Sequence, residues 1–523
     1  MGSALRIIKA MTSPVSAMDD AHYSALKAKD ARFDGHFFTG VTSTGIYCRP
    51  VCRVRTPKQE NCRYFLLAAQ AESAGFRPCL RCRPELAPGT AHADGMAAWS
   101  VQDASAILAR QAAQLLDTPQ AWSGGQVSIG QVATHMGVSE RHLRRIFETQ
   151  WGISPLQYLQ TRRLLTAKQL LTDTELPVTQ VASLSGFSSV RRFNAVFAEH
   201  YRMPPRALRQ AGQGAGLVAS TRHSAPGIVL KAAYRPPYDV AAMLSFFANR
   251  SIAGVESVDL QQHTMARTLS LELAGRRYEG WVHAQFLPDT SGVRLRISDS
   301  LADALPLVLA RLKAMLDLDA DPQTIHQVLG THFADAQGLR VPGTLDGFEL
   351  GVRAILGQQI TVRAARTLAQ RLVARFGTAL HTPWAGLTHV FPSAQTLALA
   401  TGDALGQLGI VRQRQQAIVA LARAACDGVV HLHPGADIPS NIAALQALPG
   451  IGPWTANYIA MRALRWPDAF PAGDVALQKA LGVRAAKHPA QAAELASQAW
   501  KPWRSYAVLR AWATLRPDVE APV

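Results

Sequence analysis

No stretch of the sequence approaches the ~18–20 apolar residues that a membrane-spanning helix needs, so we expect none in this chain. Residues 1–20 also lack a compact apolar stretch followed by a small-residue cleavage site, and we therefore expect no signal peptide. Both absences predict a cytoplasmic protein in a reducing environment. At 523 residues the chain is too long for one core, and domains of typically ~100–200 residues predict three or four units.

Acidic residues are scarce relative to basic ones, with 37 Asp and Glu against 54 Lys and Arg, which leaves a net charge of +17. The excess is spread along the chain: residues 1–90 hold 13 basic and 7 acidic residues, and residues 101–210 hold 12 and 7. A single basic tail therefore does not explain the charge. The balance indicates a polyanionic partner, and charge alone leaves RNA, DNA and an anionic membrane surface open.

Cysteine is also rare, and five of the six cysteines fall between residues 48 and 82. In a reducing compartment such a cluster indicates a metal site or catalysis rather than disulfides. A C-x3-C pair and a C-x2-C pair, 26 residues apart, supply the four soft donors of a tetrahedral zinc site. We predict one Zn²⁺ bound by Cys48, Cys52, Cys79 and Cys82, and a purely structural zinc module remains open. Of the other two cysteines we expect Cys62 to be a spare thiol and Cys426 a core residue of a helix.

Two stretches rich in small residues and proline, residues 84–95 and 211–226, predict linkers. Amphipathic helical patterns lie between them. After the second linker, alternating segments at residues 268–273 and 292–297 predict strands of a small sheet, and helical periodicity dominates from residue 302 onward.

The segment between the two linkers contains an internal repeat with an offset of 49 residues, in which Val132, Ala133, Gly137 and Ser139 recur as Val181, Ala182, Gly186 and Ser188. Each copy predicts a short helix, a turn at the glycine, and a second helix that begins at the serine as its N-cap. A phenylalanine precedes a proline by eight residues after each copy, at Phe147 with Pro155 and at Phe197 with Pro205. The pattern predicts two helix-turn-helix motifs.

The residues around the cysteines, TGIYCRPVCR at 44–53 and GFRPCLRC at 75–82, resemble the N-terminal domain of the Ada-type adaptive-response protein over about residues 19–85. The resemblance implies that Cys48 irreversibly accepts a methyl group from a DNA methylphosphotriester. Zinc would keep the thiolate deprotonated, and methylation would change the site charge from −2 to −1, which favours DNA binding. Nearby arginines are expected to hold phosphates: Arg49, Arg53, Arg55, Arg77 and Arg81.

Residues 101–210 resemble the AraC-type DNA-binding domain, which has two helix-turn-helix units joined by a long helix, here about residues 155–171. The second helix of each unit would enter a major groove, where Arg can read guanine and Asn adenine. For Arg191 and Arg192 taken alone, a solvated helix face is the alternative. The residues expected near DNA are Glu140, Arg141, Arg144 and Arg145 in the first unit, and Ser189, Arg191, Arg192 and Asn194 in the second.

The segment LPGIGPWTA at residues 448–456 predicts a helix-hairpin-helix motif. Gly450 and Gly452 permit a tight hairpin with free backbone N–H groups, and the following helix N-terminus, with Thr455, favours a DNA phosphate. An ordinary helix–helix turn is the alternative. Asp474 lies 22 residues after Gly452, and that spacing completes a known signature.

Residues 228–517 resemble the AlkA-type 3-methyladenine DNA glycosylase of the helix-hairpin-helix superfamily, through PPYD at 236–239, GVRAILGQ at 351–358, WTANY at 454–458 and WKPWRSYA at 500–507. The resemblance implies that Asp474 stabilises the charge on the sugar or activates water. It also implies that an extruded cationic base is held by aromatic rings, with core packing as the alternative for each ring. The expected pocket residues are Phe246, Trp454, Tyr458 and Trp512.

The sequence departs from the related families at three places. The hairpin carries Trp454 where glycosylases that also cut the backbone have a catalytic lysine, which predicts a monofunctional enzyme that leaves an abasic site. Gln359 stands where the close relative inserts a leucine wedge into DNA. No Pro-Cys-His-Arg run is present, so reversal of O6-alkylguanine is not expected.

These expectations combine into a bifunctional DNA alkylation-repair protein and transcriptional regulator, which joins a single-turnover methylphosphotriester cysteine methyltransferase to a 3-methyladenine DNA glycosylase. The alternative is a damage-responsive transcription factor whose glycosylase-like domain is inactive. Expected partners are double-stranded DNA and, during activation, RNA polymerase, but no membrane. The predicted fold is multidomain: a small zinc-binding α+β domain at 19–85, an all-α double helix-turn-helix domain at 101–210, a small antiparallel sheet at 227–315, and a helix-hairpin-helix α bundle at 316–520.

Overall fold

The computed structural model describes residues 14–89, 104–117, 127–214 and 226–515. Residues 90–95 of the first predicted linker, residues 215–225 of the second, the last residues of the predicted α bundle and residues 1–13 of the segment screened for a signal peptide lie outside these ranges. Among the described residues, no helix is both long and apolar enough to span a bilayer.

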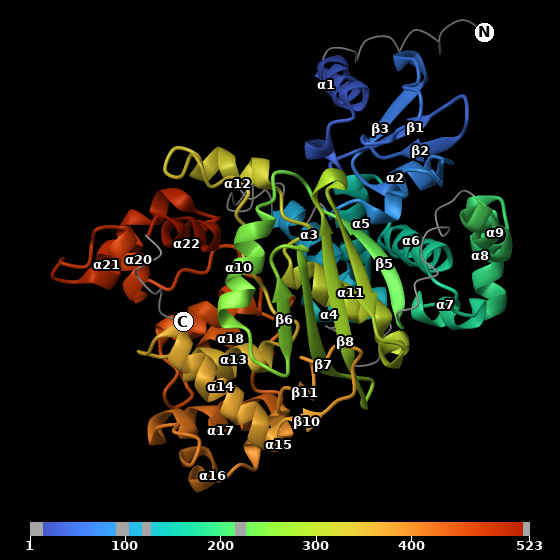
Figure 1. Cartoon of the computed structure of the whole chain (residues 1–523). Helices are drawn as coiled ribbons and strands as arrows, with labels where there is room; N and C mark the ends of the chain where they lie inside the picture. Colours follow the sequence, from blue (N-terminus) through green and yellow to red (C-terminus); the bar gives the residue numbers. More distant parts are fainter. Residues whose placement is uncertain (1–13, 90–103, 118–126, 215–225, 516–523) are drawn as a thin grey trace, which may run out of the picture.

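The N-terminal region is a small sheet flanked by helices (Figure 1). Its strands stand in the order β3-β1-β2-β4, with β1 antiparallel to β2 and β3, and β4 parallel to β2. This order brings the end of β2 next to the end of β4, and those two ends carry the cysteine pairs. The elements are α1 (Pro14–Ala28), β1 (Phe38–Val41), β2 (Ile46–Cys48), β3 (Cys62–Phe65), α2 (Ala68–Ser73) and β4 (Arg77–Pro78).

The second region is helical, and the 19-residue helix α6 runs through its middle. The predicted long helix at 155–171 is therefore confirmed and extends by two residues. One helix-turn-helix pair precedes α6 and the other follows it. The elements are α3 (Ala104–Asp117), α4 (Ile129–His135), α5 (Glu140–Trp151), α6 (Pro155–Asp173), α7 (Val178–Leu184), α8 (Val190–Tyr201) and α9 (Pro205–Gly214).

The third region begins with a five-stranded antiparallel sheet in the order β5-β9-β8-β7-β6. In β9 the buried residues alternate with more exposed ones, as expected for a strand that has one face on the core. The elements are β5 (Ile228–Ala233), α10 (Val240–Arg250), β6 (Glu256–Asp259), β7 (Thr264–Leu273), β8 (Arg276–Leu287), β9 (Gly292–Ile297) and α11 (Leu305–Met315). The predicted strand at 268–273 is the second part of β7.

A bundle of short helices completes the chain and forms the largest hydrophobic core. It contains α12 (Pro322–Leu329), α13 (Gly347–Leu356), α14 (Val362–Phe376), α15 (Ala394–Ala398), α16 (Gly402–Gly406), α17 (Arg412–Cys426), α18 (Ile438–Gln446), α19 (Pro453–Arg462), α20 (Val475–Ala480), α21 (Pro489–Ala496) and α22 (Arg504–Ala513), with the short strands β10 (Thr378–Ala379) and β11 (His389–Val390). These two strands interrupt the helical pattern that the sequence predicted after residue 302.

The regions pack directly on one another. A single hydrophobic cluster includes Phe193 and Phe197 of α8 together with Leu230 of β5 and other residues of the sheet. The buried guanidinium of Arg235, just after β5, donates to the backbone oxygens of Asp34 (2.8 Å) and Gly89 (2.7 Å) in the N-terminal region. The cysteine-bearing region also packs on the helical region, through α2 against α6.

Candidate functional site

The four predicted zinc ligands come together at the adjoining ends of β2 and β4. Their Sγ atoms all lie within 4.8 Å of one another, and no other group of described residues with at least three potential metal ligands is as close. A tetrahedral zinc ion with Zn–S bonds of about 2.3 Å places its sulfurs about 3.8 Å apart, so the cluster fits this ion. Three of the cysteines are buried, which limits access of competing ligands. The cofactor is one zinc ion held by these four sulfurs.

Arg49 is placed differently from our expectation of a phosphate contact. Its side chain is 7 % exposed, its Nε donates to Asp34 Oδ1 (2.8 Å), and its Nη1 donates to the backbone oxygen of Cys82 (3.0 Å). The Arg49 backbone N–H also donates to Cys82 Sγ (3.3 Å). This residue therefore holds the cysteine loops together, and its guanidinium is already engaged.

The other predicted phosphate contacts of this region remain open to solvent. Arg53, Arg55 and Arg81 are exposed and Arg77 is half-buried, so their proposed role stays a prediction. Cys62 lies in β3, across the sheet from the cluster, where its thiol donates to the backbone oxygen of Lys58. The expectation that Cys426 is a core residue is wrong: it ends α17 and is exposed.

The two helix-turn-helix motifs have the predicted order, but their turns differ by one residue. Ser139 caps α5 by accepting a hydrogen bond from the His142 N–H (3.2 Å). In the second motif the cap is Ser189, not Ser188, and it accepts from the Arg192 N–H (3.4 Å). The second turn is therefore one residue longer, which also explains why the Phe–Pro pairs repeat at 50 residues rather than 49.

The expected DNA-reading side chains project from these helices into solvent. The opposite faces are buried, by Leu143 and Phe147 in α5 and by Phe193 and Phe197 in α8. Those faces fix each helix against its neighbours and leave the basic face free. The exposed residues are Glu140, Arg141, Arg144, Arg145, Ser189, Arg191, Arg192 and Asn194.

A buried carboxylate joins the cysteine region to the helical region. Glu72 of α2 accepts hydrogen bonds from Tyr47 Oη (3.0 Å) and from Thr161 Oγ1 (2.8 Å) of α6. Tyr47 is the residue before Cys48. His200 of α8 lies 3.8 Å from the same carboxylate. Burial raises the pKa of the Glu72 carboxyl to about 7. Nothing in the sequence pattern indicated this contact, because its partners are far apart along the chain.

This carboxylate predicts a pH dependence of stability. Between its ordinary pKa of 4.5 and about 7, Glu72 holds a proton in the folded protein that it has released in the unfolded chain. The free energy of unfolding should therefore fall as the pH rises through this window, by up to about 3 kcal/mol. Relative to Glu72→Gln, wild type should lose stability between pH 5 and pH 8 in denaturant titrations of the full chain. Identical pH trends in both proteins would contradict this assignment.

The predicted helix-hairpin-helix motif is formed by α18, α19 and the turn between them. Gly450 has a φ of +76°, and a Cβ there would meet Ala417 Cβ at 3.0 Å, so both backbone shape and space require glycine. Gly452, the N-cap of α19, is exposed with open space around it, as a phosphate-binding turn requires.

Thr455 does not fit its expected role at DNA. It is 2 % exposed, and its hydroxyl accepts a hydrogen bond from Gln358 Nε2 (3.0 Å).

Asp474 lies at the start of α20 between two indole rings. Its Oδ1 accepts from the Leu477 N–H (2.7 Å) as N-cap and from Trp512 Nε1 (3.1 Å), while its Oδ2 accepts from Trp454 Nε1 (3.0 Å). The side chain is 1 % exposed, and burial raises its pKa although the hydrogen bonds act in the opposite direction. The carboxylate is thus held in one orientation, in surroundings where its negative charge is weakly screened by water.

The other two expected pocket rings take part in packing. Tyr458 is 1 % exposed; its ring stacks on Trp454 with 5.3 Å between centroids, and its hydroxyl accepts from Arg462 Nη1 (2.6 Å). Tyr458 therefore supports Trp454 rather than offering a free face to a base. Phe246 is half-buried, with the guanidinium carbons of Arg250 and Arg462 at 3.8 and 4.7 Å from its ring centroid.

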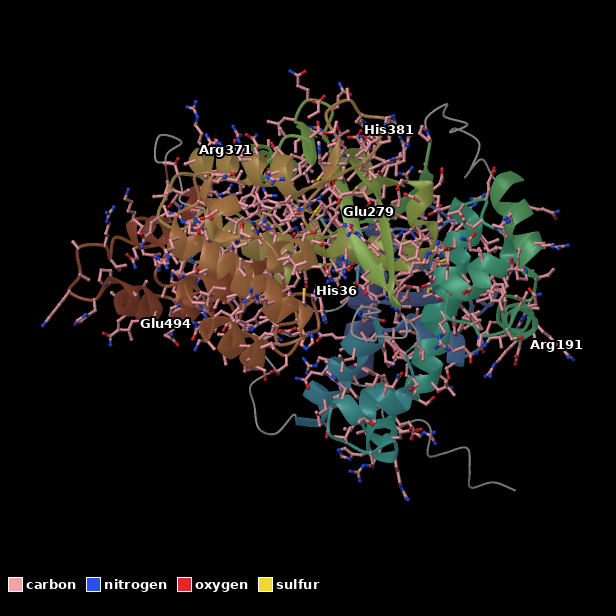
Figure 2. All side chains as sticks on the ribbon, turned by 90° about the horizontal axis from the view of Figure 1, so that it is seen from below. His36, Arg191, Glu279, Arg371, His381 and Glu494 are labelled. Atoms are coloured by element: carbon pink, nitrogen blue, oxygen red, sulfur yellow. The ribbon has the colours of Figure 1, made fainter. Side chains whose placement is uncertain are left out.

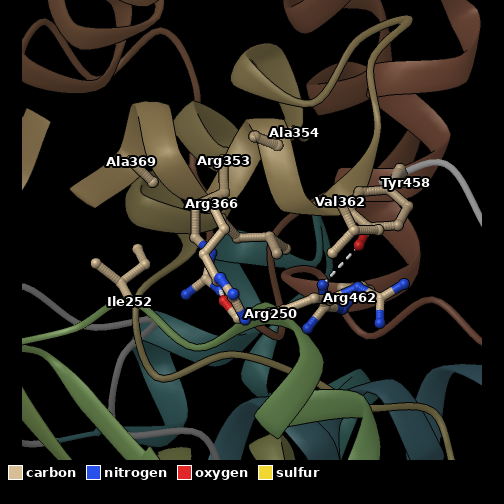
Figure 3. A pocket seen from close by; sticks show the side chains of 11 residues that line it. Arg250, Ile252, Arg353, Ala354, Val362, Arg366, Ala369, Tyr458 and Arg462 are labelled. Carbon is tan, nitrogen blue, oxygen red and sulfur yellow. Dashed lines mark hydrogen bonds between the residues drawn. The ribbon is translucent and has the colours of Figure 1, made fainter. Parts of the chain in front are cut away.

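Arg250 and Arg462 were not found by sequence reasoning. They line a recess behind Tyr458 together with Arg353 and Arg366, and Figure 3 shows their guanidinium groups gathered there. A repeated arginine four residues after a pocket aromatic, as in Phe246 with Arg250 and Tyr458 with Arg462, is the signal that could have found them.

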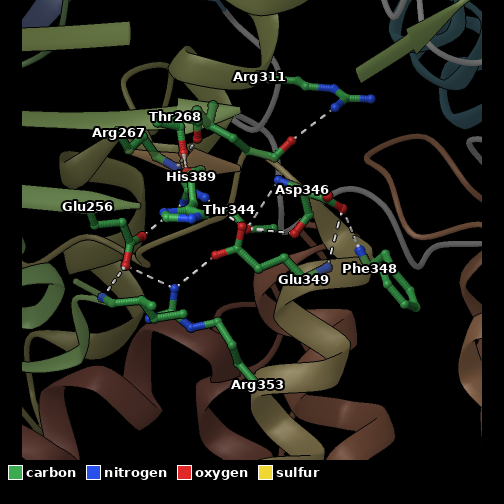
Figure 4. A network of polar contacts seen from close by, with 12 residues as sticks. Glu256, Arg267, Thr268, Arg311, Thr344, Asp346, Phe348, Glu349, Arg353 and His389 are labelled. Carbon is green, nitrogen blue, oxygen red and sulfur yellow. Dashed lines mark hydrogen bonds and ion pairs between the residues drawn. The ribbon is translucent and has the colours of Figure 1, made fainter. Parts of the chain in front are cut away.

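A closed ion-pair network fixes this recess to the sheet (Figure 4). Glu256 of β6 and Glu349 of α13 each pair with both Arg267 of β7 and Arg353 of α13, at 2.6–3.0 Å. Two acids and two bases balance one another in a buried setting, so removal of one member would leave an uncompensated charge. The network sets the position of α13, which leads to Gln359.

Gln359 occupies the exposed turn between α13 and α14 and has a φ of +57°, a left-handed conformation that is uncommon for residues other than glycine. The side chain before it, Gln358, donates to the backbone oxygen of Gly450 (2.9 Å) in the hairpin. The turn is thereby tied to the hairpin on the same surface, and its expected wedge role stays a prediction.

Comparison with known proteins finds four family models in chain order. They are the metal binding domain of Ada over residues 21–85, a helix-turn-helix domain over 132–211, the AlkA N-terminal domain over 229–346, and the HhH-GPD superfamily of base excision DNA repair proteins over 352–505.

Three relatives show how the regions combine. A Mycobacterium tuberculosis protein described as a probable bifunctional transcriptional activator/DNA repair enzyme AlkA is 38% identical over 507 residues, 95% of this chain and 96% of the relative. The Escherichia coli DNA-3-methyladenine glycosylase 2 is 37% identical over 284 residues, and the match covers 54% of this chain and 95% of the glycosylase. The Escherichia coli bifunctional transcriptional activator/DNA repair enzyme Ada is 29% identical over 37% of this chain and 50% of its own length.

Proposed function

The chain belongs to the family of bifunctional transcriptional activator/DNA repair enzymes AlkA, and from that premise we propose that it couples three activities on double-stranded DNA. Cys48 takes up methyl groups from methylphosphotriesters, the helix-turn-helix region binds an operator, and Asp474 drives excision of alkylated bases. The observation that carries this proposal is the presence, in one chain, of Cys48 within a four-sulfur cluster and Asp474 between two indole N–H groups.

Methyl transfer uses Cys48 as its nucleophile and consumes it in a single turnover. Bound zinc supplies positive charge that keeps the Cys48 sulfur deprotonated at neutral pH. The sulfur forms a bond to the methyl carbon, the carbon–oxygen bond to phosphate breaks, and its electron pair stays on the oxygen as a phosphodiester anion. The thioether is stable, so each chain reacts once. Arg53, Arg55 and Arg81 are exposed around the site and are available to hold the phosphates.

Base excision rests on Asp474. As the bond between sugar and base breaks, the electron pair leaves with the base and positive charge develops on the sugar, which a fixed carboxylate stabilises at close range. Trp454 and Trp512 hold that carboxylate in place and border the site. Since the hairpin carries Trp454 instead of an amine, no Schiff base can form, and water is the group that completes the reaction to an abasic site. This arrangement speaks against an inactive glycosylase-like domain.

The helix α8 lies far from the last helices of the C-terminal bundle. Figure 2 shows Arg191 of α8 far from Glu494 of α21, a helix that packs on α20, which begins after Asp474. An operator held by α5 and α8 therefore leaves the hairpin surface free. We infer that the regulator, once bound, contacts RNA polymerase while the excision surface remains available to other DNA.

Methylation of Cys48 is expected to raise operator affinity. The change removes one negative charge from the metal site, and phosphates are repelled less. Gel shifts with methylated and unmethylated protein on operator DNA selected with this protein should show tighter binding of the methylated form, and the difference should shrink as salt concentration rises. Equal affinities of both forms at low salt would overturn the switch while leaving the repair activities untouched.

A further inference from the structure

An unusual pair of buried arginines lies where the sheet meets the helical bundle. Arg510 projects inward from α22 and is 1 % exposed, and Arg340, in the segment between α12 and α13, is 3 % exposed. Arg340 packs its guanidinium 5.1 Å from the ring centroid of Tyr238, a residue that precedes α10. Asp317 brings their two segments together: its carboxylate accepts from the N–H of Val341, the residue after Arg340, and from Tyr506 Oη, one helical turn before Arg510 in α22.

Both guanidinium groups have buried donors without acceptors. Nε, Nη1 and Nη2 of Arg510 all lack a hydrogen-bond partner among the described residues, as do Nε and Nη1 of Arg340. Only Nη2 of Arg340 is used, and it donates to the backbone oxygens of Arg235 (2.6 Å) and Pro237 (3.0 Å). Five N–H-bearing atoms of these two buried side chains are therefore unsatisfied, an arrangement that folded proteins avoid.

The surrounding charges do not balance these cations. Asp317 lies beside both arginines in the fold, but its carboxylate already pairs with Arg465 and accepts from the Val341 N–H (3.2 Å) and Tyr506 Oη (3.0 Å). Burial, then the neighbouring Arg340, lower the pKa of Arg510 to about 10. That value still leaves Arg510 charged at neutral pH, and neither Arg340 nor Arg510 forms an ion pair with a carboxylate of the described residues.

We propose that Arg340 and Arg510 bind a small inorganic anion, of the halide or phosphate kind, inside the C-terminal domain. Water could accept the orphan hydrogen bonds, but it would leave the surplus positive charge in a poorly screened interior, whereas an anion satisfies both. The depth of the donors excludes the backbone of a bound DNA strand as the ligand, because a polymer phosphate cannot reach them from the surface.

The position of the site gives the ion a structural task. Arg510 and Trp512 belong to the same helix, and Trp512 Nε1 donates to Asp474 Oδ1. An ion that bridges Arg510 to Arg340 fixes α22 against the segment before α13 and so fixes the indole that orients Asp474. The ion is thereby part of the domain's architecture and does not touch the reacting atoms.

Anion binding is tested directly by anomalous diffraction from crystals of the full chain grown or soaked in bromide. An ordered bromide between Arg340 and Arg510 is expected, and density for water alone at that place would overturn the proposal. This readout does not depend on excision activity, so it stands or falls separately from the proposed function.

A thermal titration gives the second test. At constant ionic strength, replacing gluconate by bromide or by phosphate should raise the Tm of wild type by roughly 2–4 °C, and the salt that acts at the lower concentration identifies the ion. Arg510→Met should lose the response, since it removes the charge while keeping the volume, whereas the control Arg484→Met, at an exposed position, should keep it. An equal response in Arg510→Met would refute the site.

Discussion

Replacement of Asp474 by asparagine is expected to slow the release of methylated purines by about 100- to 1,000-fold, because the positive charge that develops on the sugar loses its fixed counter-charge. The helix cap should survive, since an asparagine oxygen can still accept from the Leu477 N–H, and Asn caps helices about as well as Asp. The new NH₂ group would face Trp454 Nε1. Both groups are hydrogen-bond donors, so the hydrogen bond from Trp454 would be lost. Single-turnover release of 3-methyladenine from alkylated duplex measures the effect.

A matched control separates catalysis from capping. Asp437 caps α18 by accepting from the Ser440 N–H (2.9 Å), and this carboxylate is exposed and away from both indoles. Asp437→Asn should therefore release bases at the wild-type rate. A near-normal rate in Asp474→Asn, with its Tm unchanged, would remove Asp474 from the mechanism.

The same carboxylate predicts the acid limb of the pH profile. Burial raises the pKa of Asp474 above that of an ordinary aspartate, and the proposed excision mechanism needs its ionised form. As the pH is lowered, the rate of excision by wild type should therefore begin to fall at a pH above the ordinary pKa of an aspartate, because Asp474 takes up its proton there. The pH profile of single-turnover base release measures this limb.

Replacement of Cys48 by serine is expected to abolish methyl uptake completely. A serine hydroxyl is far less acidic than a thiol and is not a zinc-activated nucleophile of comparable strength. After incubation with methylated DNA, intact-mass measurement should show wild type gaining one CH₂ group and Cys48→Ser gaining none. Base release should be unchanged in the variant, because Asp474 lies in a different region of the fold with its own hydrogen bonds.

Cys62→Ser is the control for this experiment, since Cys62 is a cysteine of the same sheet that lies outside the sulfur cluster. It should gain the CH₂ group as wild type does and keep its zinc. Methyl uptake by Cys48→Ser, or loss of uptake in Cys62→Ser with zinc retained, would show that another thiol is the acceptor.

Local patterns predicted the elements that carry function. Spacing within C-x3-C and C-x2-C restricts where the sulfurs can point, and the repeated glycine and serine positions predicted two helix-turn-helix motifs. The one-residue error at Ser188 arose because a strict 49-residue offset ignores a longer turn, and a comparison with the Phe–Pro spacing would have identified Ser189.

Contacts between distant segments could not be predicted in this way. Arg49 was expected at DNA because it is basic and adjacent to Cys48, yet Asp34 holds it in the interior. Thr455 and Tyr458 belong to a motif that predicts DNA and base contacts, but Gln358 and Arg462 engage their hydroxyls. Cys426 looked like a core residue by its helical surroundings and is exposed because it is the last residue of α17.

Sequence alone determined the donor set for zinc, the order of the regions, and the identity of the acidic residue after the hairpin, since each depends on residue types at short spacing. Tertiary structure decided which arginines remain free, how Glu72 and Arg235 dock the cysteine region, and which donors of Arg340 and Arg510 are buried without a partner among the described residues. The reason is physical: burial and pairing depend on neighbours contributed by segments tens to hundreds of residues away, whereas helix caps, turns and ligand spacing depend on the few residues beside them.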